Sequence, residues 1–173
     1  MIEIARGEAL STLGEGSAAV RAQLHEIPDA QLTHPKAIGG GDWSAKDLIG
    51  HLTFWEELAL QTIDAWRAAE MPWIEATPDD IDRVNENAVA AKAPLSLDRI
   101  RVEAVNIYEG LVREIEGMSD EEWRSDPPYE SERPMKLFER LGGVLGMQDR
   151  PFGHAFAHLE DLEAFAGSVC ADR

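Results

Sequence analysis

Two histidines, His154 and His158, lie four residues apart in a stretch with the apolar spacing of a helix. In an α-helix, residues i and i+4 lie one above the other on the same face, so both imidazole rings can reach one point in space. A third histidine, His51, lies in the apolar stripe of a predicted helix much earlier in the chain. Three histidine nitrogens can hold a metal ion and leave coordination positions open for water or a substrate. The sequence therefore predicts a metal centre at His51, His154 and His158.

Ordinary packing is the alternative for each of these histidines. A lone histidine at an apolar helix position, as at His51, is more often a hydrogen-bonded core residue than a metal ligand. The pair also differs from the metalloprotease motif His-Glu-x-x-His, in which the glutamate acts as the base. Here residues 155–157 are Ala-Phe-Ala, so a base has to come from another part of the chain. His25 and His34 are predicted to be ordinary surface residues.

The apolar periodicity predicts helices over most of the chain. The predicted helices cover about residues 3–26, 44–69, 77–93, 96–117 and 151–167. Ser44 and Asp47 have the spacing of a capping box at the start of the second helix. Thr77 followed by Pro78 has the pattern of a helix start, because proline is favoured at the first helical position.

The connections decide which bundle these helices can form. Residues 118–134 look irregular, and residues 137–147 are apolar but interrupted by glycines, so their state stays open. The loops between the four long helices are too long for a simple up-and-down ladder. No convincing run of alternating apolar and polar residues indicates a strand. We therefore predict one all-α domain over residues 1–173, a four-helix bundle with crossover connections.

The net charge of the chain restricts the classes of partner that it can bind. Lys and Arg number 16 against 33 Asp and Glu, a net charge of −17. Such a surface repels phosphate backbones and anionic lipids, so we expect no nucleic-acid partner and no membrane partner. No stretch approaches the ~18 apolar residues of a membrane span. The single cysteine, Cys170, and the charged N-terminus favour a reducing, cytoplasmic location.

Two segments together resemble the DinB/YfiT-like metalloprotein superfamily. Residues 42–52, DWSAKDLIGHL, look like the helix start that leads to that family's first ligand histidine. Residues 153–162, GHAFAHLEDL, look like its closing helix, which supplies the other two ligands. The helical layout agrees from end to end, so the resemblance covers nearly the whole chain.

The resemblance implies a four-helix bundle that holds a divalent metal ion, nickel or zinc most often, on three histidines. It assigns these ligands to His51, His154 and His158, and it also implies a homodimer. Related branches are isomerases and S-transferases that use a low-molecular-weight thiol, and a colibactin-resistance hydrolase. The mycothiol-dependent maleylpyruvate isomerases have glutamate at the position of His154, which argues against that exact activity. The glycines before Pro151 also depart from the family pattern.

These observations lead to one main hypothesis and two rivals. The main hypothesis is a metal-dependent enzyme that acts on a small-molecule substrate by thiol transfer or hydrolysis, with a low-molecular-weight thiol as cofactor in the first case. The first rival is a resistance protein that sequesters a small molecule without turnover. The second is a structural bundle in which the histidines only pack.

Several other residues are candidates for the surroundings of the metal. Asp47 and Asp161 are the carboxylates nearest in sequence to the predicted ligands, and each could fix a ring tautomer or merely face water. Arg150, one turn before His154, could receive an anionic group. Four tryptophans could line a pocket over the metal or pack within the bundle, namely Trp43, Trp55, Trp66 and Trp73.

Overall fold

The computed structural model describes residues 3–35, 37–38, 42–76, 80–147 and 149–171 of the chain. Within these residues the fold is all-α, as predicted, with one isolated β-bridge between Met147 and Arg150. The long helices are α1 (Arg6–Glu26), α3 (Ala45–Arg67), α6 (Leu97–Gly117) and α9 (Leu159–Ala171). The shorter elements are α2 (Asp29–Leu32), α4 (Trp73–Ala76), α5 (Ile81–Lys92), α7 (Asp120–Trp123), α8 (Leu137–Val144) and the 3-10 helix η1 (His154–His158).

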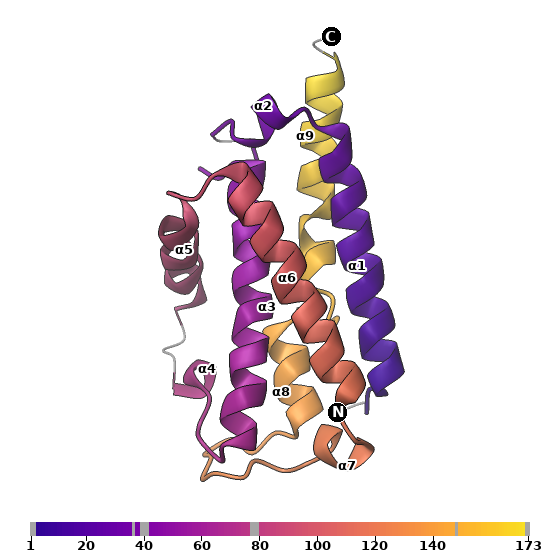
Figure 1. The fold of residues 1–173 in the computed structure, drawn as a ribbon, viewed down its shortest axis with the longest axis vertical. Helices are drawn as coiled ribbons and strands as arrows, with labels where there is room; N and C mark the ends of the chain where they lie inside the picture. The colour runs from indigo at the N-terminus through magenta and orange to yellow at the C-terminus, as the bar shows by residue number, and fades with distance from the viewer. Residues whose placement is uncertain (1–2, 36, 39–41, 77–79, 148, 172–173) are drawn as a thin grey trace.

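The long helices lie side by side as a bundle, with α3 packed on α6 and α1 packed on α9 (Figure 1). Helices α3 and α6 both run downward in this view, so the chain returns to the top between them through α4 and α5. This return is the predicted crossover connection. Helix α8 lies in the lower half of the bundle and α9 in the upper half, with η1 between them. The fourth position of the bundle is therefore built from separate pieces.

Two helix starts follow directly from local sequence. The Ser44 side chain accepts a hydrogen bond from the Asp47 backbone N–H at 3.2 Å, and the Asp47 carboxylate accepts one from the Ser44 backbone N–H at 2.9 Å. This is the predicted capping box, and it begins the helix that carries His51. Asp80 caps α5 through the Arg83 backbone N–H at 3.1 Å. The predicted start at Thr77 and Pro78 lies outside the described residues.

The predicted continuous helix over residues 151–167 is wrong. Phe152 has a φ of 61°, a left-handed conformation through which an α-helix does not continue. The backbone N–H of His154 is held by the Leu145 carbonyl at 3.0 Å, outside any α-helical pattern. The chain then makes the 3-10 turn η1 and becomes α-helical from Leu159 to Ala171. Residues 137–147, whose state the sequence leaves open, contain the short helix α8.

Buried apolar side chains form two clusters, and the histidines lie between them. On α3, Trp55 belongs to one cluster and Leu48 to the other, with His51 between the two. The same division separates Leu145 from Leu162 on either side of η1. The bundle therefore carries a polar layer between two apolar cores.

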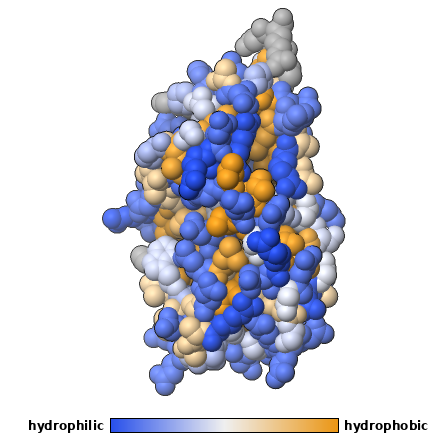
Figure 2. Space-filling model, viewed as in Figure 1, coloured by the Kyte–Doolittle hydropathy of each residue, from blue (hydrophilic) through white to orange (hydrophobic). Residues whose placement is uncertain are grey.

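The surface is largely hydrophilic, with apolar residues gathered along the middle of the face shown in Figure 2. Val102 and Val105 of α6 contribute to the exposed apolar surface, with 55% and 45% of their areas accessible. Among the described residues, no helix combines the length and hydropathy that crossing a lipid bilayer requires.

Candidate metal centre

Three imidazole rings from two elements meet in the polar layer. The Nε2 atom of His154 lies 3.0 Å from Nε2 of His51 and 3.3 Å from Nε2 of His158. Each ring offers one nitrogen, and the three nitrogens lie within 4.8 Å of one another. The structure thus brings together all three residues that the sequence singled out. His34, predicted to be a surface residue, is exposed.

The two later histidines meet for a different reason than the predicted one. In a 3-10 helix residues i and i+3 are eclipsed, so residues four apart do not share a face. His154 lies at the first position of η1 and His158 at the last, immediately before α9 begins. Their rings still converge, with centroids 5.2 Å apart and planes inclined at 66°.

Glycines hold the turn that positions His154. A Cβ atom at Gly146 would lie 2.3 Å from the Gly142 carbonyl oxygen and 2.7 Å from Cα of Pro151. Only glycine fits there without moving the backbone. The backbones of Met147 and Arg150 pair through hydrogen bonds of 3.0 and 3.2 Å, which closes the turn. Gly142 and Gly146, two of the glycines that break the sequence pattern, are therefore what lets the turn pack against α8.

Burial keeps the three rings neutral at neutral pH. His51 is only 2% exposed, and burial together with the neighbouring His154 and His158 lowers its pKa to about 3. Burial lowers the pKa of His154 to about 4, with His158 adding to the effect. Burial also lowers the pKa of His158, against the opposing charge of Asp161. Neutral rings have a free nitrogen lone pair, which is the form that binds metals.

Two of the four candidate tryptophans flank the histidines. The ring centroid of Trp43 lies 4.8 Å from that of His51, and the centroid of Trp55 lies 6.0 Å from that of His154. Trp66 instead donates a hydrogen bond to Ser125 at 2.8 Å, away from the histidines. The side chain of Trp73 is 53% exposed. Only the first two can shape the space around the rings.

Asp47 and Arg150, two of the three polar residues proposed around the ligands, contact other groups. The Asp47 carboxylate accepts hydrogen bonds from the Ser44 backbone and hydroxyl, so it serves as a cap. The Nδ1 atom of His51 is buried and has no hydrogen-bond partner in the part of the chain that the structure describes. The guanidinium of Arg150 lies over the ring of Phe156, 3.6 Å from its centroid. Neither Asp47 nor Arg150 therefore faces the histidines with a free group.

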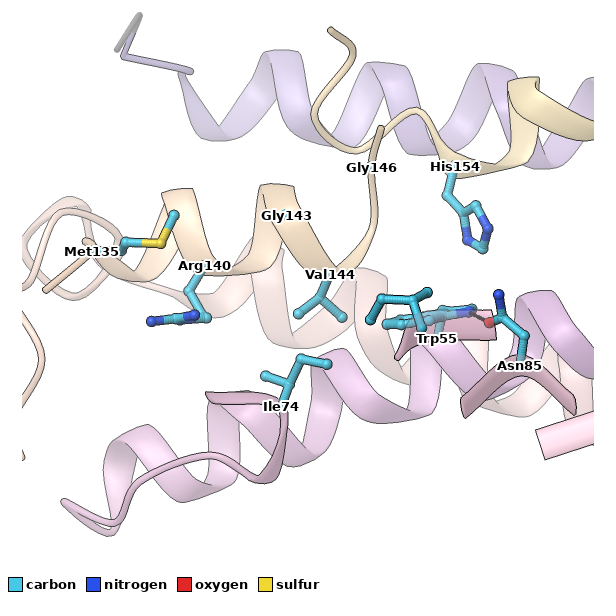
Figure 3. Close-up of a pocket in the computed structure, with 10 residues that line it drawn as sticks. Trp55, Ile74, Asn85, Met135, Arg140, Gly143, Val144, Gly146 and His154 are labelled. Atoms are coloured by element: carbon cyan, nitrogen blue, oxygen red, sulfur yellow. Dashed lines mark hydrogen bonds between the residues drawn. The ribbon is translucent and has the colours of Figure 1, made fainter. Parts of the chain in front are cut away.

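A pocket of about 460 Å³ opens beside His154 (Figure 3). Ile74, Met135 and Val144 contribute to its apolar wall. Asn85 lies in the wall and accepts a hydrogen bond from the Trp55 indole N–H at 3.0 Å. Arg140 also lines the pocket and forms a partly buried ion pair with Glu75 at 2.8 Å. The His154 side chain extends toward the space above Trp55, so His154 lies at one end of the pocket.

Sequence reasoning missed one acid near the centre. Glu56 shares a small cavity with His154, and burial raises the pKa of its carboxyl to about 8, against the charge of Arg21. The sequence does contain a sign that Glu56 lies near the core, because Glu56 comes four residues after Leu52 and three before Ala59. Those spacings place it on the flank of the apolar stripe.

Comparison with known proteins supports the family and the fold. The model of the mycothiol maleylpyruvate isomerase N-terminal domain matches residues 13–140, a segment that contains His51 but ends before His154. A comparison with curated protein sequences gave no match.

Three solved structures have the same fold. An uncharacterised protein from Escherichia coli UTI89 has a TM-score of 0.75 at 16% identity, over 96% of this chain and 95% of that one. The colibactin self-resistance protein ClbS, in complex with a dsDNA, has a TM-score of 0.64 at 15% identity, over 99% and 96%. The sibling lethal factor precursor DfsB has a TM-score of 0.61 at 16% identity, over 98% and 95%. At these identities the likeness is one of fold. Since the family match spans most of the sequence, the chain belongs to the mycothiol maleylpyruvate isomerase N-terminal domain family, within the DinB-like superfamily.

Proposed function

We propose that His51, His154 and His158 bind one divalent metal ion, and that the protein is an enzyme acting on a small molecule at this ion. The observation that carries the proposal is the convergence of three neutral imidazoles, one of which, His154, lines a pocket. The reaction class we propose is thiol transfer or hydrolysis. We also propose that residues 1–173 act as one domain.

The spacing of the nitrogens fits a shared ion. Two nitrogens bound to a tetrahedral ion at about 2.0–2.1 Å lie roughly 3.3 Å from each other. The Nε2 of His154 has neighbours at 3.0 and 3.3 Å. A neutral imidazole carries one N–H, which can serve only one of these contacts. A cation between the rings satisfies all three nitrogens.

Nickel or zinc suits a ligand set made only of histidines. When bound, such an ion supplies a Lewis acid that favours deprotonation of an incoming water or thiol. The chain itself supplies neutral ligands, an apolar wall that excludes water, and a hydrogen-bonding edge at Asn85. These are the parts that both proposed reactions require.

The pocket fits a small organic molecule. Its volume of about 460 Å³ lies within the range of roughly 300–1,000 Å³ that is usual for such sites. The name of the matched family contains a low-molecular-weight thiol, which supports a thiol as cofactor. Because His154 stands where the maleylpyruvate isomerases have glutamate, we propose a different substrate for this chain.

Sequestration of a small molecule without turnover is the second candidate. The described residues that line the pocket include no carboxylate that could act as a base there. The name of ClbS as a self-resistance protein points in the same direction. Reaction of the nickel- or zinc-loaded protein with a panel of thiols and electrophiles separates the two. More than one product per chain identifies an enzyme, and a stable one-to-one complex identifies a binding protein.

The partners we propose are a small-molecule substrate and a second copy of the chain. The exposed valines of α6 are a candidate apolar contact for a homodimer. Sedimentation equilibrium tests this, and a monomer at micromolar concentration would contradict it. We propose a cytoplasmic location and no nucleic-acid partner, since the acidic surface disfavours phosphate.

A further inference from the structure

A second, much smaller cavity lies against the metal centre. Its volume is about 20 Å³, enough for one water molecule. Ser17 of α1, Glu56 of α3 and His154 of η1 line it. Trp55 and His154 line both this cavity and the large pocket, so they form the partition between the two.

Glu56 is a half-buried acid whose carboxyl has no protein partner among the described residues. Among the described residues no hydrogen bond or ion pair reaches its carboxyl, although Arg21 contributes a favourable charge. The Arg21 guanidinium lies over the ring of Tyr108 instead, 5.5 Å from the centroid. A carboxyl that is partly withdrawn from water loses hydration unless another polar group replaces it. A water in the adjoining cavity would supply the missing bond.

His154 has one ring nitrogen that does not face the other two histidines. Its Nε2 faces the other two histidines, so its Nδ1 is the nitrogen that does not point at them. When Nε2 binds an ion, the neutral ring carries its proton on Nδ1, which becomes a donor. Ligand histidines nearly always give this proton to a carboxylate, a carbonyl or a water, and that bond fixes the ring.

We propose that Glu56 positions His154 through one water molecule held in this cavity. The Nδ1–H of His154 donates to the water, and the water donates to a carboxyl oxygen of Glu56. This chain of bonds holds Nε2 toward the ion and makes it a stronger ligand. The inference rests on the proposed metal centre. It gives Glu56 a positioning function, and it explains why an acid remains in this part of the bundle.

Metal affinity tests the inference independently of turnover. Competition with a chromogenic chelator measures the Kd for Zn²⁺ and Ni²⁺ of the whole chain and of Glu56→Leu. Loss of such a partner weakens metal binding by roughly 10- to 100-fold. We expect that loss in Glu56→Leu, with an unfolding temperature equal to or above that of the wild type, because the apolar side chain removes the cost of desolvating the carboxyl. A weaker metal affinity without a loss of thermal stability excludes general damage to the fold.

The neighbouring acid provides the matched control. Glu57 is on the same helix but pairs with Lys92 at 3.6 Å and lies outside both cavities. Glu57→Leu should therefore bind metal with wild-type affinity. In the zinc-loaded wild type, the Nδ1–H proton of His154 should give a downfield NMR signal, and Glu56→Leu should shift or broaden it.

Each result decides between the proposals. Wild-type affinity and an unchanged imidazole signal in Glu56→Leu would overturn the inference and leave the metal centre standing. A wild-type protein that binds neither ion would overturn both. A wild-type protein that binds the ion but shows no turnover with any thiol or electrophile would overturn the enzyme proposal alone.

Discussion

The Nε2 atoms of His51 and His154 lie 3.0 Å apart, although one residue belongs to the second long helix and the other to the closing turn. This contact joins two distant parts of the chain within the polar layer between the two apolar cores. The proposed metal ion would be coordinated here by residues of both α3 and η1.

Replacement of His51 should remove the metal and keep the fold. With one of three ligands gone, we expect His51→Ala to retain less than about one tenth of the wild-type metal, since each ligand contributes strongly to affinity. Elemental analysis of protein purified without a histidine tag measures this, and circular dichroism checks the helices. His34→Ala, at an exposed position, is the control. An unchanged metal content in His51→Ala would mean that His51 is not a ligand.

Acid should destabilise the metal-free protein through its histidines. The pKa of His51 is about 3 and that of His154 about 4 in the folded chain, below the usual value of 6.5. The unfolded chain therefore binds more protons between these values, so the free energy of unfolding falls as the pH drops from about 6.5 toward 4. Urea denaturation at pH 7 and pH 5 measures the change. A smaller change in His51→Gln than in the wild type assigns part of it to this ring, and equal changes would contradict the assignment.

Glu56 should give the opposite pH dependence. Its folded pKa is raised to about 8 from 4.5, so its protonated form is the one the fold favours. Stability from this group is fully present below about pH 4.5 and is lost as the pH rises through 8. We expect Glu56→Gln to be more stable than the metal-free wild type at pH 8, by on the order of 1 kcal/mol. Thermal melts at pH 5 and pH 8 check this, with Glu57→Gln as control. No gain at pH 8 would show that the carboxyl is solvated in the fold.

A side chain at Gly146 should disrupt the turn before His154. Its Cβ would lie 2.3 Å from the Gly142 carbonyl oxygen, so the backbone has to move. We expect Gly146→Ala to lose a few kcal/mol of stability and to bind metal more weakly, because His154 moves with the turn. Gly143→Ala is the matched control, since a Cβ there meets nothing within 4 Å. Equal stabilities of the two variants would show that the turn tolerates a side chain.

The acidic surface should prevent DNA binding. A net charge of −17 opposes the phosphate backbone, whatever the related fold of ClbS binds. We expect no shift of a short DNA duplex in a gel at physiological salt, with micromolar protein. A salt-dependent shift, weakened as the salt concentration rises, would identify a local basic surface that the net charge hides.

Local sequence rules predicted much of the fold. The capping pair of Ser44 and Asp47 defines the start of α3, and the period of its apolar residues places His51 toward the core. These are interactions within one or two turns, so they are visible in the sequence. The family resemblance rested on the same segment, and the family match confirms it.

Long-range packing explains what the sequence did not reveal. The 3-10 geometry of η1 depends on the left-handed Phe152 and on the bond from the His154 N–H to the Leu145 carbonyl. Neither has a local signature strong enough to overrule the helical spacing of the two histidines. The burial of Glu56 depends on α1 and η1 closing over it, which a helical wheel of α3 alone cannot show.

The gap between α8 and α9 creates the room for a substrate. Gly143, Val144, Gly146 and His154 border both this gap and the large pocket. An unbroken helix would carry bulky residues through that space and leave a solid bundle with buried rings. The interruption of the helix between α8 and α9 is therefore what leaves a pocket in the bundle. Relatives with a continuous helix there should have no substrate access to the ion, even if they keep all three ligands.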